Sequence, residues 1–109
     1  MKNILLLLTI TGVAFAQKDA KGVVTKNIDA KAIYLDKCAV CHGQDGSGNT
    51  AKGRKLKMKG VKETAAKMMP EEMIKIVTDG KGADMDAFGK ELGTDQVKAV
   101  VAYYRGLAK

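Results

Sequence analysis

Apolar residues recur at helical spacing in three separated segments of the chain. The first segment begins at Asn27, a residue type that favours helix N-caps, and has Asp29 in its first turn. Its apolar stripe is spaced so that all members share one helix face. The members of the stripe are Ala30, Ile33, Tyr34, Cys38 and Cys41. The pattern therefore predicts a helix that turns both thiols towards the core.

Two further helices are predicted in the second half of the chain. The first covers residues 70–78, with a proline at its first position, two glutamates in its first turn and Asp79-Gly80 at its end. Its apolar face is formed by Met73, Ile76 and Val77. The second starts near Thr94, an N-cap residue type, and runs to about Leu107. Its buried stripe is formed by Val97, Val100, Val101, Tyr104 and Leu107.

Glycine-rich segments separate these helices. Residues 43–62 begin with closely spaced glycines, serine and asparagine, and this composition predicts a loop with Leu56 and Met58 as its inward anchors. Residues 80–93 form a second such loop around Met85 and Phe88. No strand pattern or internal repeat is visible in the sequence. The expected fold class is all-α, with about three main helices.

The start of the chain is typical of a secretory signal peptide. Lys2 precedes an apolar run, and Ala14-Phe15-Ala16 has the small-x-small pattern that precedes signal cleavage, which predicts a cut before Gln17. The alternative is an uncleaved anchor, but the apolar run is much shorter than the roughly 20 residues that span a bilayer. We expect a cleaved signal at 1–16, a flexible polar leader at 17–26 and one domain at 27–109, exported to the periplasm without a stable membrane span.

The charge balance narrows the class of partner. The chain has 19 Lys and Arg residues against 12 Asp and Glu residues, a formal net charge of +7. Export and the absence of an RNA-binding or helix-turn-helix motif argue against nucleic acid. Seven of the basic residues lie within 52–67, where Glu63 is the single acid. This segment is either a solvated surface or a patch that steers docking onto an acidic protein partner.

Cys38-Ala39-Val40-Cys41-His42 carries the chemistry of the chain. Two thiols three positions apart lie on nearly the same side of a helical turn, so both can add to the vinyl groups of one porphyrin, and the following histidine can ligate the iron. A thioredoxin-like redox pair would need a strand-to-helix context that is missing here. A structural zinc site needs about four ligands, and the chain has two cysteines and one histidine. The motif therefore predicts covalent haem.

The chain also resembles the class I cytochrome c family over nearly all of its expected mature length. The resemblance is carried by AKAIY at 30–34, CAVCHGQDGSG at 38–48, GKGADM at 80–85 and VVAYYR at 100–105. It implies a cytochrome c fold wrapped around one covalent haem c, with His and Met as axial ligands of the iron. It also implies contact between the first and last helices, for which Ala30, Val100 and Tyr103 are in the expected positions.

The second axial ligand is expected to be a methionine thioether, the soft neutral donor of this class. Methionine is more often a core filler, and Met73 fits that role on its helical face, while Met68 and Met69 lie where that helix begins. Met85 differs because the glycines at 80 and 82 let its loop fold closely over a flat ring. We expect His42 and Met85 to ligate the iron, with Met58 as the alternative to Met85.

Three features depart from the family pattern. Asp86 follows Met85 where a proline is frequent, and the chain has no Trp to bond a haem propionate, so a Tyr, Lys or Arg would have to do so. Residues 43–62 contain no proline whose carbonyl could orient the His42 imidazole. We expect another backbone carbonyl of that loop to accept a hydrogen bond from His42.

The expected function is outer-sphere transfer of single electrons between respiratory redox partners, an oxidase or a reductase. The protein would supply orientation, dielectric and a docking surface, while the haem supplies the redox chemistry, so we expect a monomer that is not an enzyme on its own. One alternative is a haem subunit of a larger oxidoreductase complex. Another is a haem sensor or gas-binding module in which Met85 leaves the iron.

Overall fold

This computed structural model describes residues 28–109, and that part of the chain contains six helices. They are α2 (Ala30–Lys37), α3 (Ala39–His42), α4 (Ala51–Lys55), α5 (Val61–Lys67), α6 (Pro70–Asp79) and α7 (Thr94–Gly106). The predicted signal peptide at 1–16 and leader at 17–26 lie outside the described residues. Within 28–109, no helix is long and apolar enough to cross a membrane.

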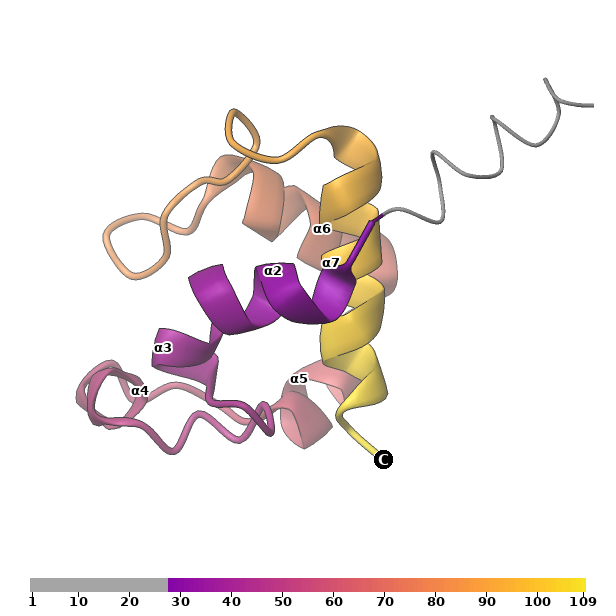
Figure 1. The fold of residues 1–109 in the computed structure, drawn as a ribbon. Coiled ribbons are helices and arrows are strands. Elements are labelled where there is room, and N and C mark those ends of the chain that lie inside the picture. Colours follow the sequence, from indigo (N-terminus) through magenta and orange to yellow (C-terminus); the bar gives the residue numbers. More distant parts are fainter. Residues whose placement is uncertain (1–27) are drawn as a thin grey trace, which may run out of the picture.

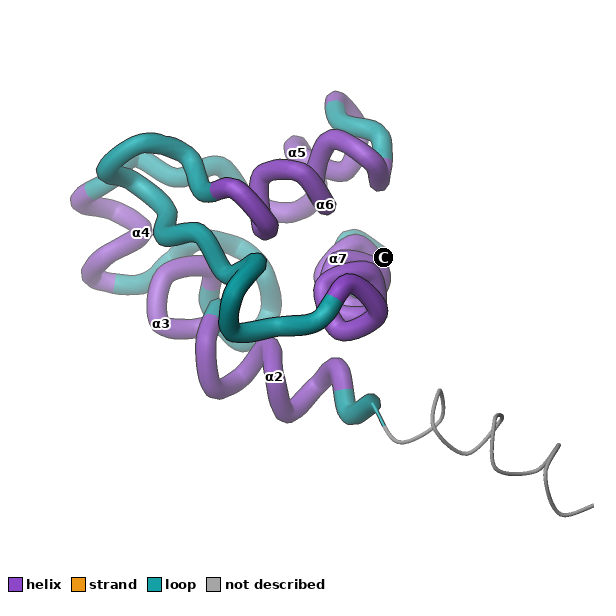
Figure 2. The backbone as a smooth tube through the Cα atoms, turned by 90° about the horizontal axis from the view of Figure 1, so that it is seen from above, coloured by secondary structure: helices purple, strands orange, loops and turns teal. Residues whose placement is uncertain are grey.

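Helix α7 is the element on which three of the other helices pack. It contacts α2, α5 and α6. Figure 1 shows α2 crossing α7, and Figure 2, seen from above, shows α7 between α2 on one side and α5 and α6 on the other. The predicted contact between the first and last long helices is therefore confirmed. The buried side chains are Tyr34, Val61, Met73, Leu92, Val97, Val100 and Val101.

The first predicted helix is present but starts later and is interrupted. It begins at Ala30 rather than near Asn27, because the Asp29 side chain accepts a 3.0 Å hydrogen bond from the Ala32 amide and caps the helix. The chain leaves the regular helix at Cys38 and resumes it in α3. The two thiols are therefore carried across a helix break rather than along one straight helix.

The other two predicted helices match α6 and α7 within about one residue. Both N-termini are capped from inside the helix: Glu72 accepts a hydrogen bond from the Met69 amide, and Gln96 accepts one from the Gly93 amide, each at 3.0 Å. The N-cap of α7 is therefore Gly93, and the prediction that Thr94 is the cap is wrong by one position.

The predicted loop over 43–62 is wrong in its second half, which contains α4 and the start of α5. Thr50 stabilises α4, since its hydroxyl accepts from the Gly53 amide at 2.8 Å and donates to the Cys41 carbonyl at 2.7 Å. Gly53 is buried, and a Cβ atom there would collide with the Gly48 carbonyl oxygen and lie 2.7 Å from that of Cys41. Only glycine allows α4 to pack this closely on the Cys-Cys-His segment.

The second glycine loop, 80–93, is fastened to α6 at its base. The amides of Phe88 and Gly89 donate to the carbonyls of Val77 and Thr78 at 2.8 and 3.0 Å. Closer to its tip, the Lys81 amide donates to the Met85 carbonyl at 2.8 Å. Gly80 and Gly82 take positive φ angles that favour glycine. The orange loop beside α6 in Figure 1 is this segment.

Candidate functional site

One cavity of about 340 Å³ brings together three of the four residues singled out by the sequence. Cys38 enters it from the break between α2 and α3, His42 from the end of α3, and Met85 from the 80–93 loop. Much of the remaining lining is apolar, formed by Leu56, Met58, Met68, Met73, Ile76, Val77, Val100 and Val101. Cys41 is half-buried next to the cavity but does not line it. The site is a single apolar chamber with sulfur and imidazole groups in its wall.

The surroundings of Cys38 and His42 favour uncharged side chains. The two cysteines are not joined in a disulfide, and burial raises the pKa of the Cys38 thiol to about 11, while the nearby Lys37 opposes that shift. Burial also lowers the pKa of His42. A neutral imidazole is the form that binds a metal, and a thioether sulfur is likewise neutral. The chamber therefore fits a covalently tethered haem whose iron is bound by His42.

The hydrogen bond expected at His42 is not formed within the described residues. Its Nδ1 atom is buried and has no hydrogen-bond partner there, so the prediction that a carbonyl of the 43–62 loop accepts from it is wrong. The ring instead meets the ring of Tyr104 in a T-shaped arrangement, with centroids 5.0 Å apart. A buried polar atom without a partner is rare in folded proteins and is typical of functional sites.

Four methionines line the cavity, and their surroundings separate them. Met73 is buried in the core cluster between α6 and α7, which agrees with its predicted role as a core filler. Met68 packs against the same cluster, at the junction of α5 and α6. Met58 and Met85 are both half-buried and are held by loops. The cavity thus keeps both candidates for the axial ligand, and the fastened loop favours Met85.

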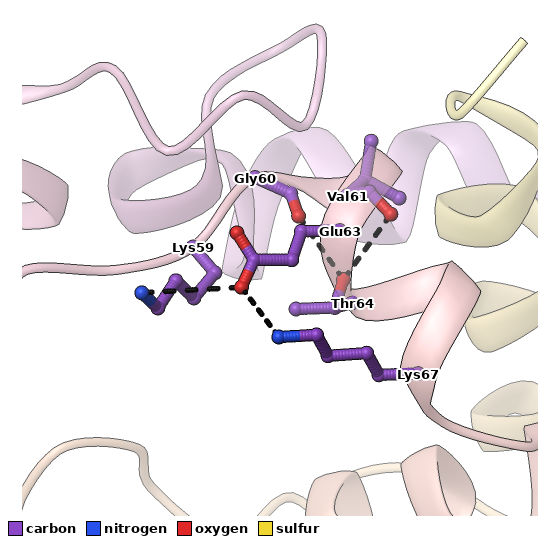
Figure 3. A network of polar contacts seen from close by, with 6 residues as sticks. All are labelled: Lys59, Gly60, Val61, Glu63, Thr64 and Lys67. Carbon is purple, nitrogen blue, oxygen red and sulfur yellow. Dashed lines mark hydrogen bonds and ion pairs between the residues drawn. The ribbon is translucent and has the colours of Figure 1, made fainter.

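Charged side chains surround the cavity. Lys57, Lys59 and Lys81 line it and are exposed, together with Asp84 on the methionine loop. Lys59 shares the carboxylate of Glu63 with Lys67, at 3.9 and 3.1 Å, as Figure 3 shows. Positive charge therefore outweighs negative charge around the opening.

The sequence did not identify several hydroxyl-bearing side chains as residues of the site, although it placed Tyr34 and Tyr104 on buried helical stripes. The Tyr34 hydroxyl donates to the Gly43 carbonyl at 2.6 Å, and burial is the main cause of its raised pKa. The hydroxyls of Thr64 and Tyr104 lie 3.0 Å apart. The sequence did hold one signal for them, because a buried tyrosine hydroxyl usually needs a hydrogen-bond partner. The pattern gave no way to name the partners, which lie nine positions from Tyr34 and forty from Tyr104.

The chain is similar to several known proteins. The family model described as cytochrome C oxidase, cbb3-type, subunit III matches residues 26–103. The cbb3-type cytochrome c oxidase subunit FixP of Azorhizobium caulinodans is 31% identical over 75 residues, which are 69% of this chain. Those residues are 25% of FixP, so the chain spans about a quarter of that relative.

Two solved structures are also similar. The KustC0563 c-type cytochrome has a TM-score of 0.70 and 34% identity, and the match covers 75% of this chain and all of that one. A Tyr-to-Phe mutant of the same cytochrome has a TM-score of 0.67 and 33% identity, over 73% of this chain and 99% of the mutant.

Proposed function

We propose that this chain, which belongs to the cbb3-type cytochrome c oxidase subunit III family, is a haem domain that carries single electrons within a respiratory oxidase complex. The predicted all-α cytochrome c fold and covalent haem c are both confirmed for this small class I-like c-type cytochrome. The observation that carries the proposal is the shared cavity of Cys38, His42 and Met85.

Each site residue has a proposed role. Cys38 and Cys41 would hold the haem through thioether bonds, and the His42 imidazole and the Met85 thioether would bind its iron. When bound, the haem supplies a reversible ferric–ferrous couple that accepts or gives one electron. The apolar walls from α6 and α7 would limit the access of water, and the imidazole of His42 and the thioether of Met85 are neutral groups that would hold the iron. We propose that the chain itself transforms no substrate.

The oxidase-subunit role is favoured over the free shuttle that the sequence analysis put first. Similarity to FixP, which is itself a subunit of an oxidase, supports the proposal that this chain acts with respiratory partners. The free shuttle remains the second candidate, because the match to KustC0563 covers the whole of that c-type cytochrome. Co-purification with a membrane oxidase from native cells would support the subunit, and recovery of the chain alone would support the shuttle.

The proposed docking surface surrounds the cavity opening. Lys57, Lys59 and Lys81 are exposed there and carry positive charge, which complements an acidic surface on a redox partner. Docking at this opening places the partner close to the haem. The chain would work on the periplasmic side of the membrane after export by residues 1–16.

The test of the proposed function is expression together with a haem-ligation system. We expect a red protein with one covalent haem in a pyridine haemochrome assay, and an intact mass that shows cleavage before Gln17. Replacing Cys38 and Cys41 with alanine should abolish covalent attachment. A colourless wild-type protein with both thiols unmodified would exclude the proposal.

A further inference from the structure

Within residues 28–109, the Nδ1 atom of His42, which lines the cavity, does not make the hydrogen bond that usually orients a metal-binding imidazole. Such a histidine almost always donates its second ring N–H to a carboxylate, carbonyl or water, and this bond fixes the plane of the ring. The Nδ1 atom of His42 is buried and has no partner among residues 28–109. Among residues 28–109, the ring is therefore oriented by contacts other than a hydrogen bond at Nδ1.

The ring of Tyr104 is in position to do this. It lies 5.0 Å from the His42 ring, centroid to centroid, and the two planes meet at 64°. Aromatic pairs prefer such tilted arrangements to parallel face-to-face contact, so this contact resists rotation of the imidazole. Since Tyr104 belongs to α7, it connects His42 to the central helix of the fold.

Tyr104 is itself held from two other directions. Its hydroxyl is 3.0 Å from the Thr64 hydroxyl. The Thr64 hydroxyl is in turn 3.3 Å from the carbonyl oxygens of Gly60, the N-cap of α5, and Val61, its first residue (Figure 3). Its ring stacks on that of Tyr34 with centroids 6.1 Å apart. A side chain fixed at both its hydroxyl and its ring can act as a rigid support.

The support also reaches the backbone next to His42. Tyr34 donates to the carbonyl of Gly43, the residue that follows His42. Tyr104 therefore contacts the imidazole ring, and Tyr34, which stacks on Tyr104, holds the chain immediately after that ring. We infer that Tyr104 is the positioning residue of the axial histidine, and that its aromatic ring takes the place of the missing hydrogen-bond acceptor. This inference rests on the proposed role of His42 as an iron ligand.

The orientation of an axial imidazole can be measured directly in the ferric holoprotein. The plane of the ring determines how unpaired spin is distributed over the porphyrin, and this distribution sets the order and spread of the haem methyl resonances in proton NMR. A side chain that contributes only to packing energy would change stability without reordering these resonances.

The test compares three variants of the holoprotein. Tyr104→Leu removes the aromatic contact and should reorder the haem methyl resonances. Tyr104→Phe keeps the ring and should keep the wild-type order. Thr64→Val also removes the hydrogen bond between the Thr64 and Tyr104 hydroxyls but leaves the Tyr104 ring unchanged, so it should behave like Tyr104→Phe. If Tyr104→Leu does not fold, Tyr104→Met provides the same comparison with an unbranched side chain.

Two results would overturn the inference. One is a wild-type methyl pattern in Tyr104→Leu or Tyr104→Met. The other is a pattern in Tyr104→Phe that is as altered as that of the aliphatic variants, since it would assign the effect to the hydroxyl. Failure of the proposed function is distinguishable, because the wild-type protein would then lack a low-spin, histidine-ligated spectrum.

Discussion

The hydroxyl of Tyr34 donates a 2.6 Å hydrogen bond to the backbone carbonyl of Gly43, nine positions later. This bond ties α2 to the end of the Cys-Cys-His segment. Tyr34→Phe should lower the free energy of unfolding by about 1 kcal/mol, the usual net value of one hydrogen bond. The cost stays small because the Gly43 carbonyl also accepts from the Gly46 amide at 3.1 Å. Urea unfolding of the wild type and of Tyr34→Phe measures this difference in the free energy of unfolding. Tyr103→Phe is the control, because no hydrogen bond of the Tyr103 hydroxyl is found within residues 28–109, and an equal loss there would contradict the assignment.

The same hydroxyl predicts a difference in alkaline stability. Burial raises the pKa of Tyr34, so the folded state favours its neutral form. This contribution is complete below the unfolded-state pKa of about 10 and is lost as the pH rises above it. Wild-type protein should therefore lose more stability than Tyr34→Phe above this pH. Equal slopes of unfolding free energy against pH for the two proteins would show that the hydroxyl does not titrate in this way.

The identity of the second axial ligand is decided by two methionine variants. Met85→Ala should open a coordination position, so the reduced protein should bind carbon monoxide, while the wild-type spectrum should not change. The ferric variant should also lose the sulfur-to-iron charge-transfer band at the red end of the spectrum. Met58→Leu, which changes the other half-buried candidate, should retain that band. The reverse result would assign the ligand to Met58, and rapid carbon monoxide binding by the wild type would favour the sensor.

Gly53 should tolerate no side chain. In Gly53→Ala, the new Cβ atom meets the Gly48 carbonyl oxygen and lies 2.7 Å from that of Cys41, so the variant should lose about 1–3 kcal/mol of stability through overpacking. Gly106→Ala is the matched control because nothing lies within 4 Å of its Cβ position in α7. It should leave stability unchanged or raise it by up to about 1 kcal/mol. Similar effects of both variants would argue against close packing at Gly53.

The basic opening of the cavity should control association with the redox partner. Lys57→Gln should slow electron transfer to an acidic partner at low salt, and the difference from wild type should shrink as the ionic strength rises. Lys75→Gln makes the same change in net charge at a position on α6 that does not line the cavity. There the Lys75 ammonium lies 3.1 Å from the Asp79 carboxylate. This control should have little effect. Equal slowing by the two variants would indicate net charge rather than a local docking surface.

Much of the fold could be predicted because its signals are local. The stripes of α6 and α7 and the glycines of the 80–93 loop depend on residues close together in the sequence, and so does the haem motif. The helices α4 and α5 were missed because their stability is not local. Thr50 caps α4 while bonding to Cys41, and Gly53 packs against the Gly48 backbone. Glycine within a short basic segment otherwise indicates a loop.

The contact that supports His42 was not predicted for a similar reason. The sequence shows that residues 43–62 contain no proline, and we therefore expected another backbone carbonyl of that loop to accept a hydrogen bond from His42. The contact with Tyr104 comes from a helix about sixty residues later, and its hydroxyl partner Thr64 lies on a helix that was not predicted. Residue type alone gave no reason to connect these three side chains.

The hydrogen bonds that join Phe88 and Gly89 to the end of α6 have a kinetic consequence. They close the methionine loop at its base, so detachment of Met85 requires neither separation of α6 from α7 nor loss of the core. Opening of this loop is therefore expected to be a local event with a lower free energy than global unfolding. In native-state amide hydrogen exchange, the Lys81 amide should exchange through partial opening, while the amides of Val100 and Val101 should wait for global unfolding.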